Sequence, residues 1–414
     1  MGGAFLSVAA LRRRATECSM FRAAPMIDPA AAPAKPRPSP SRLELLDGVR
    51  GWCALSVVLF HVFWEIFGVA TPAFRNPVTG FFFDGDLAVC IFFVLSGEAL
   101  SAAFFAGGGD AATIRLAIKR YPRLATPILA ACLITFALDR LGLVFVAPAS
   151  RVIPIVYWMR DWLQEPLTFT YAMRYSLVDV FVGVKGGRAI IPMLWTMPIE
   201  LLGSFVVFAI LLMWKRLNRP RTLLLGLFIV ATAMPTGSIA NYLSCFFAGV
   251  AFADWRTQGL FMRVGERLGP GVWAAIVFFA AVDGTLHWFG CESGKTAIAV
   301  ALMFAVYASP ALCAFFSSEL SRALGRISFP LYLIQFPVLI SVTSWMIVQT
   351  GAGGGTLSLS AIWGISLASV AICLLAAIAF APIERVARSV GDRLIAIVGQ
   401  DRRSRPTANA PAGS

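Results

Sequence analysis

An apolar stretch, residues 45–68, is long enough to cross a bilayer, yet it carries Arg50, His61 and Glu65. Ionisable side chains inside a membrane helix are costly, so by default they mark a functional site. Arg50 and His61 are eleven residues apart in the chain. This spacing places them on one helical face, about 16 Å apart along the axis. Glu65 follows one turn after His61 on the same face.

This face predicts chemistry in which a proton or a group is transferred. A buried imidazole is biased toward its neutral form, which both a general base and a nucleophile require. A neighbouring carboxylate such as Glu65 can orient the ring. The alternative is that Arg50 extends to the membrane interface and that His61 is held by a neighbouring helix.

Later apolar stretches carry further polar residues. Ser96 and Glu98 lie near the middle of residues 87–106. The Ser96–Gly97 pair also permits close helix packing, which is the structural alternative, but an intramembrane carboxylate requires a partner. Residues 194–214 begin with Trp195, an interfacial anchor, and include Glu200. Gln335 lies in residues 327–349.

A cationic segment, residues 118–127, precedes another apolar stretch. It contains Lys119, Arg120 and Arg123 around a tyrosine. Such a segment can bind anionic lipid headgroups or the phosphates of a cofactor.

The composition predicts an all-α, polytopic membrane protein. The 414 residues are 58% hydrophobic and 14% charged, and the mean hydropathy is +0.76. A soluble domain has about 45–50% apolar and about 25% charged residues. The net charge of +13 comes mostly from short loops and the two ends, which is typical of positive-inside topology rather than of nucleic-acid binding. The lipid bilayer is therefore the expected partner.

We expect about ten transmembrane spans with both termini in the cytoplasm. The predicted spans are residues 48–69, 87–106, 122–139, 194–214, 221–236, 239–254, 270–284, 296–316, 327–349 and 358–382. Residues 1–42 and 391–414 are predicted to be unstructured basic tails around a membrane domain at 43–390. The long segment 140–193 is rich in aromatic residues, so it predicts helices at the membrane interface or a lid over the site.

Other candidate motifs fail. The eight cysteines (18, 53, 90, 132, 245, 291, 313 and 373) include no CxxC pair, and the chain has only two histidines, so we expect no metal site. The ESGKT sequence at 292–296 has Phe289 where a P-loop needs glycine, and GAGGGT at 351–356 ends in threonine where a GxGxxG motif needs glycine.

Six segments together resemble the acyltransferase-3 family of integral-membrane O-acyltransferases. They are LDGVRGWCALSVVLFH (45–61), FFVLSGEALS (92–101), KRYPRL (119–124), LWTMPIELLGSF (194–205), GRISFPLYLIQFPV (325–338) and PIER (382–385). The resemblance implies an essential Arg50–His61 pair, a cytosolic acyl-CoA donor, and motif positions at Arg120, Arg123, Trp195 and Glu200. Glu98 and Gln335 depart from the family pattern, which puts the identity of the acceptor in doubt.

From these observations we expect transfer of an acyl group, most simply acetyl, from acyl-CoA to a carbohydrate or glycolipid hydroxyl at the plasma membrane. The expected catalytic residues are His61, Arg50, Glu65 and Glu200. The expected donor-binding residues are Arg50, Lys119, Arg120 and Arg123. The expected acceptor-binding residues are Ser96, Glu98, Trp195 and Gln335. The alternative is a proton-coupled transporter or flippase that uses Arg50, His61 and Glu98 as a relay, although the sequence shows no repeated halves.

Overall fold

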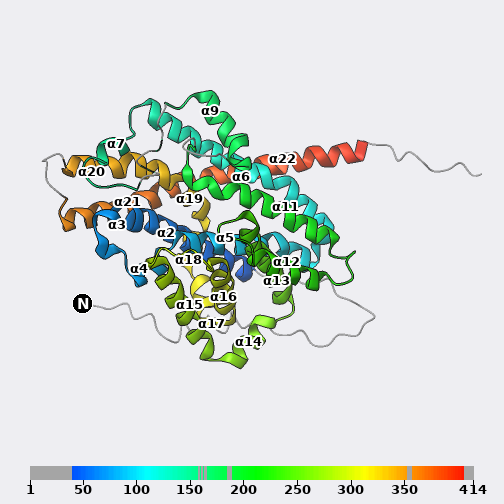
Figure 1. Cartoon of the computed structure of the whole chain (residues 1–414). Helices are drawn as coiled ribbons and strands as arrows, with labels where there is room; N and C mark the ends of the chain where they lie inside the picture. Colours follow the sequence, from blue (N-terminus) through cyan, green and yellow to red (C-terminus); the bar gives the residue numbers. More distant parts are fainter. Residues whose placement is uncertain are drawn as a thin grey trace, which may run out of the picture.

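A computed structural model describes residues 40–156, 159, 162, 166–183, 189–351 and 357–404. Across these residues the secondary structure is helical, in agreement with the predicted all-α class, and the helices pack into a bundle (Figure 1). The predicted N-terminal tail, 1–42, lies outside the described residues except for its last three positions. Those three positions already belong to the first helix, α2 (Pro40–Leu59).

Six helical stretches of the described chain are long and apolar enough to cross a membrane. They are Glu44–Ala70, Pro77–Arg140, Pro192–Met213, Gly271–Trp288, Ser328–Gly351 and Leu359–Ile397. A seventh is possible if α16 (Lys295–Ala308) and α17 (Pro310–Phe316), bent by 98°, form one broken span. The stretch Pro77–Arg140 contains two of the predicted spans, whereas α12 (Pro220–Thr232) is shorter than a usual crossing. The count of ten and the sides of the termini therefore stay predictions.

The first span is a helix with a π-helical insertion. α2 continues into η1 (Phe60–Ile66), which is π-helical, and then into α3 (Phe67–Ala70). Near its start, α2 crosses α18 (Glu319–Arg326) at glycines. A Cβ on Gly51 would lie 2.4 Å from the backbone nitrogen of Gly325, and one on Gly325 would lie 2.4 Å from the carbonyl oxygen of Asp47. Only glycine permits this backbone approach, which brings the Arg50 turn against α18.

The helices that contain the second and third predicted spans, α5 and α6, form a hairpin. α5 (Gly85–Ala103) passes through η3 (Phe104–Gly108) into α6 (Gly109–Arg140), and the reversal uses Gly107 at φ 101°. α5 packs closely on α13 (Ile239–Thr257), because a Cβ on Gly97 would lie 2.3 Å from the carbonyl oxygen of Phe246. Close packing at the Ser96–Gly97 pair is thus observed.

The C-terminal helix is longer than the sequence indicated. α22 (Pro382–Ser404) packs along α6, where Lys119 forms an ion pair with Asp392. The prediction of an unstructured tail from residue 391 is therefore wrong for 391–404, and 405–414 lie outside the described residues. The physical reason is amphipathic packing, since Ala387 on the inner face of α22 is only 1% exposed.

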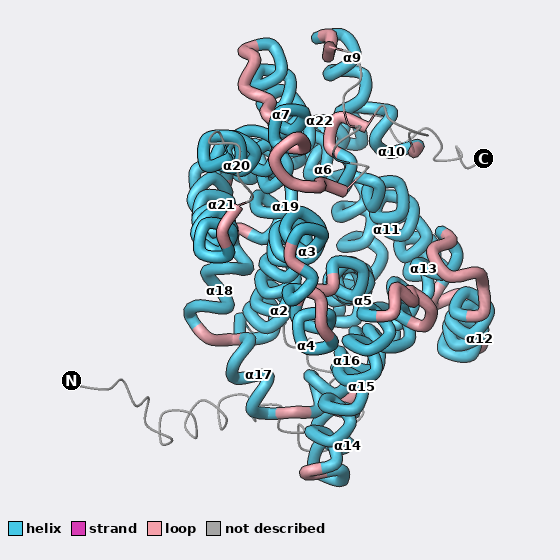
Figure 2. Tube along the Cα trace, turned by 60° about the vertical axis from the view of Figure 1, so that its left-hand side comes forward, coloured by secondary structure: helices cyan, strands magenta, loops and turns pink. Residues whose placement is uncertain are grey.

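The described residues of the segment 140–193 include short helices at one end of the bundle, where Figure 2 shows α7 and α9. Phe169 is exposed, whereas Trp162 and Tyr175 are buried. The indole nitrogen of Trp162 donates to the carbonyl oxygen of Ala189 at 2.8 Å, and Tyr175 is 2% exposed. These two side chains therefore pack within the protein, and interfacial helices or a lid stay predictions for this segment. Tyr157, Trp158, Arg160, Lys185 and Arg188 lie outside the described residues.

The remaining helices complete the bundle. They are η2 (Pro72–Phe74), α4 (Pro77–Phe82), α7 (Val146–Ala149), α9 (Phe169–Arg174), η4 (Tyr175–Asp179), α10 (Val180–Val182), η5 (Pro192–Thr196), α11 (Met197–Met213), α14 (Leu260–Leu268), α15 (Gly271–Trp288), α19 (Ser328–Val338), η6 (Leu339–Thr343), α20 (Ser344–Gly351) and α21 (Leu359–Phe380).

Candidate active site

A cavity of about 630 Å³ lies beside the start of the first span. This volume is in the range of small-molecule sites, about 300–1,000 Å³. Its lining comes from α2, α5, α6, η5, α11 and the α18–α19 and α21–α22 junctions. Six arginines line it: Arg50, Arg120, Arg123, Arg326, Arg385 and Arg388. Only three carboxylates accompany them, those of Asp47, Glu200 and Glu384, so the cavity has an excess of positive charge.

Arg50 enters the cavity from α2. One of its terminal nitrogens lies 3.2 Å from Oδ1 of Asp47, one turn earlier, and the side chain is 24% exposed. The glycine crossing described above places Gly325 and Arg326 at the same wall. Guanidinium groups from helices far apart in sequence thereby face one volume, an arrangement that suits a multiply charged anion.

A second part of the wall joins α5, α6 and α11. Nε of Arg120 donates to Oγ of Ser204 at 2.7 Å, and a terminal nitrogen of Arg120 pairs with Oε1 of Glu200. Ser96 donates to the same Glu200 oxygen at 2.6 Å. The structure thus brings together three residues predicted for the site. Here Glu200 anchors Arg120 and Ser96, which is a positioning contact.

His61 lies farther along the first span, at the start of the π-helical segment, and does not line the cavity. Its Nδ1 is 2.7 Å from the carbonyl oxygen of Val57. Because a carbonyl only accepts, Nδ1 carries the hydrogen, and a neutral ring then has its lone pair on Nε2. Nε2 is 3.7 Å from Oε2 of Glu65. The carbonyl of Val57 therefore fixes the tautomer of the ring, and Glu65 lies on the Nε2 side.

The arrangement around Nε2 suits a base. A neutral Nε2 can accept a proton, and the Glu65 carboxylate beside it would stabilise the imidazolium that forms. The His61 side chain is 11% exposed, so water is largely excluded. Insertions of π-helix are frequent at functional sites because they redirect side chains.

Comparison with known proteins now gives the family. A family model described as an acyltransferase domain, Acyl_transf_3, matches residues 43–380. The chain belongs to the acyltransferase-3 family. No curated protein matches it significantly. Among solved structures it is similar to the crystal structure of an H+/Ca2+ exchanger, CAX, at 13% identity over 94% of this chain and 98% of that one. The TM-score of that match is 0.13, so nothing is inferred from it.

Four residues predicted to bind the donor or the acceptor of this membrane acyltransferase do not line the cavity. Glu98 is 1% exposed, pairs with Arg256 and accepts from the hydroxyl of Tyr307 at 2.6 Å. It does not line the cavity, because its buried partners hold it on the α13–α16 side. Arg256, 158 positions away, is a partner that no local sequence signal could reveal.

The other three also point away from the cavity. Gln335 is fully buried and donates to the carbonyl oxygen of Tyr332 at 3.1 Å. Trp195 is 46% exposed with its ring 5.6 Å from that of Tyr242, as expected of an interfacial anchor. Lys119 does not line the cavity, because its ammonium group is paired with Asp392 on α22.

Several cavity residues were not predicted. Arg326 and Arg385 lie within two of the segments that resemble the family, and Arg388 follows the second of these, but none of the three was predicted to line the site. Tyr332 also lines the cavity and shares a 2.8 Å hydrogen bond with Thr196. Their convergence depends on helix packing, which charge patterning alone does not give.

Proposed function

We propose that this acyltransferase transfers an acyl group, most simply acetyl, from cytosolic acyl-CoA to a hydroxyl of a carbohydrate or glycolipid. The observation that carries the proposal is the cavity with six arginines next to a span that holds an oriented histidine. The phosphates of CoA would be bound by Arg50, Arg123 and the arginines of α22. The pantetheine arm would extend along the first span toward His61, about 16 Å from Arg50 along the helix axis.

In this reaction Nε2 of His61 takes the proton of the acceptor hydroxyl. The hydroxyl oxygen then attacks the thioester carbonyl, and the tetrahedral intermediate expels the CoA thiolate. The thiolate recovers the proton from the imidazolium, so the products are an ester and free CoA. Glu65 stabilises the imidazolium between the two transfers. In an alternative order, Nε2 attacks the thioester first and carries the acyl group.

The acceptor would approach from the His61 side of the bundle, and the positive-inside pattern would place the arginine cavity on the cytosolic side of the plasma membrane. Supporting this sidedness, the cationic residues of α6, α18 and α22 gather at the cavity.

The deciding assay is release of free CoA thiol from acetyl-CoA by the purified protein with candidate glycans and glycolipids. We expect acceptor-dependent thiol release that His61→Ala abolishes. Arg263→Ala is the matched control, because Arg263 donates to the carbonyl of Gln258 and does not line the cavity. Substrate movement across proteoliposomes without thiol release would instead support the transporter alternative.

A further inference from the structure

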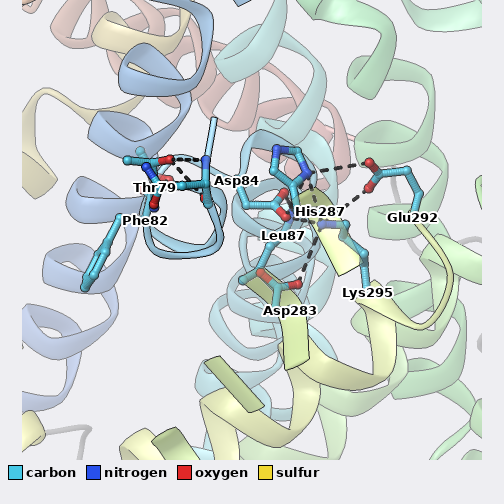
Figure 3. A network of polar contacts seen from close by, with 10 residues as sticks. Thr79, Phe82, Asp84, Leu87, Asp283, His287, Glu292 and Lys295 are labelled. Atoms are coloured by element: carbon cyan, nitrogen blue, oxygen red, sulfur yellow. Dashed lines mark hydrogen bonds and ion pairs between the residues drawn. The ribbon is translucent and has the colours of Figure 1, made fainter. Parts of the chain in front are cut away.

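A second charged group of residues lies farther along the first span than the arginine cavity, beside Phe60 and Trp64. We name it the Lys295 cluster. Its members, shown in Figure 3, are Asp84, Asp283, His287, Glu292 and Lys295. They come from the loop before α5, from α15, and from the start of α16 and the turn before it. The sequence alone does not show that these residues lie together, because Asp84 is about 200 positions from the others.

Glycines explain how these side chains become buried together. A Cβ on Gly284 would lie 2.1 Å from the carbonyl oxygen of Pro77, and one on Gly80 would lie 2.9 Å from the carbonyl oxygen of Gly284. This close contact of α15 with α4 encloses the cluster. Asp283 is 0% exposed and Lys295 is 3% exposed.

Lys295 is the hub of the cluster. Its ammonium nitrogen pairs with Oδ2 of Asp84 and lies 3.6 Å from Oδ1 of Asp283 and 3.4 Å from Oε2 of Glu292. Nδ1 of His287 is 3.3 Å from Oδ2 of Asp84 and 3.6 Å from Oε1 of Glu292. One ammonium group therefore serves three carboxylates.

The charges in the Lys295 cluster do not balance. With His287 neutral and all three carboxylates ionised, the cluster would hold two uncompensated negative charges. Even with His287 charged, one negative charge would remain uncompensated. Asp283 is the least supported carboxylate, since neither of its oxygens makes a hydrogen bond there. An ionised carboxylate in such surroundings is strongly unfavourable.

The cluster contacts the turn that holds His61. The ring centroid of His287 lies 4.3 Å from that of Trp64 and 5.8 Å from that of Phe60. Phe60 precedes His61, and both begin η1. Phe60 also packs on the start of α5, where a Cβ on Gly85 would lie 2.7 Å from its ring. The ring of Phe60 therefore contacts both histidines of the chain, since its centroid also lies 5.2 Å from that of His61.

We propose that the Lys295 cluster is a proton-binding site that controls the conformation of the His61 turn. Asp283 holds the proton, and Glu292, 44% exposed, exchanges it with solvent. When the proton leaves, ionised Asp283 competes with Asp84 for Lys295. His287 then loses its fixed neighbours and moves against Trp64 and Phe60. The other ionisable groups near these elements are Asp86, Arg75, His61 and Glu65.

The first test does not depend on acyl transfer. Because the chain has two histidines, the full-length protein labelled with ¹³C and ¹⁵N histidine in detergent micelles gives two imidazole signals. The signal that remains in His61→Gln belongs to His287. We expect the His287 signal to shift through one transition with pH while its ring nitrogens keep the shifts of a neutral ring. An imidazolium signature would show that His287 takes the proton, and no transition would show that nothing does; either overturns the proposal.

Variants identify the proton-binding group. Asp283→Asn, which mimics the protonated carboxyl, is expected to abolish the transition. Asp254→Asn is the matched control, because Asp254 is a buried aspartate that pairs with Arg221 outside the cluster. It is expected to leave the transition in place. A transition that persists in Asp283→Asn contradicts the proposal.

Glu292→Gln gives a second, independent reading if Asp283→Asn does not fold. Loss of one negative charge weakens proton binding, so the transition is expected to move to lower pH. An unmoved transition contradicts the proposal. Replacement of Na⁺ by a large organic cation at fixed pH is expected to change nothing, and a shift would show that the site binds a metal cation instead.

The link to catalysis rests on the proposed function. If the protein transfers acyl groups, the wild type is expected to lose activity as the pH rises through the His287 transition, and Asp283→Asn is expected to keep it. Equal loss in both overturns the link. If no acceptor supports thiol release, the proposed function fails, but the histidine signals still decide the proton site.

Discussion

The arginine cavity and the Lys295 cluster are both rich in charge, yet they differ in how that charge is compensated. The cavity holds six arginines and three carboxylates around about 630 Å³ of space. The cluster holds both signs within ion-pair distance and lies buried between helices. Uncompensated charge of one sign beside open space indicates a site for a ligand of opposite sign. Charges of both signs in direct contact and largely buried indicate an internal ion-pair network. Such a network can still take up or release a proton.

The first span connects the two regions. Arg50 lies at the cavity, and ten positions later Phe60 packs against His287 of the cluster. His61 therefore lies between two regions. The arginine cavity would bind the donor, and the Lys295 cluster would control the conformation of the His61 turn. Variants in each region test whether the two regions have these different roles.

The largest expected effect is that of His61→Ala. General acid–base catalysis contributes roughly 10²–10⁴-fold to a rate, so kcat should fall by about that factor. Stability should change less than activity, because truncation to alanine leaves the helical backbone of the first span in place. Thiol release and thermal unfolding in detergent measure the two effects. Wild-type turnover would show that His61 is not the base, and a catalytic residue would then be sought among the residues that line the cavity.

Next in size is the stability loss of Lys295→Met. Removal of one partner of a buried ion pair costs about 3–5 kcal/mol, and here three carboxylates lose their shared cation. Unfolding by heat or denaturant should show this loss. Arg123→Ala in the cavity should cost no stability, since it relieves repulsion among like charges. The double variant Lys295→Met/Asp84→Asn should regain part of the loss, and a loss as large as in the single variant would contradict the role of Lys295 as hub.

The difference between the two regions also explains what the sequence could predict. Arg50 and His61 were found because helical spacing within one segment fixes their shared face. Ser96, Arg120 and Glu200 were found individually, but their hydrogen bonds join three helices. The Lys295 cluster was missed because Asp84 is distant from the other members in the chain, and because Lys295 was considered only as part of the ESGKT motif, which fails as a P-loop. The C-terminal part of α22 was not predicted, because the basic composition of residues 391–414 was interpreted as an unstructured tail.

A moderate effect is expected from Arg50→Ala on donor binding. Hydrogen bonds to charged groups contribute about 1.5–3 kcal/mol, which corresponds to an increase of roughly 10–100-fold in donor KM. Acceptor KM should change less, because the lost contact is remote from the reacting carbonyl. Arg50→Lys should recover only part of the effect if the contact is bidentate. Arg123→Ala should act in the same direction but more weakly, since Arg123 is proposed to bind only the distal phosphates.

The outcome against this prediction is equally specific. If donor KM is unaltered in both arginine variants while expression or membrane retention falls, the cavity cations bind lipid headgroups rather than the donor. Arg263→Ala, at an arginine outside the cavity, controls for general effects of losing a positive charge.

The smallest expected effect is that of salt, and it separates the two regions without any substitution. Raising the ionic strength from about 0.1 M to about 1 M shortens the Debye length from about 10 Å to about 3 Å. The exposed arginines of the cavity should then attract the donor less, so donor KM should rise several-fold. The Lys295 cluster is buried and its partners are in contact, so the His287 signal should stay where it is. A salt-insensitive donor KM would mean that the arginines do not meet the donor's phosphates. A salt-sensitive His287 signal would mean that ions reach the buried members of the cluster. The proposed difference between the two regions would then be contradicted.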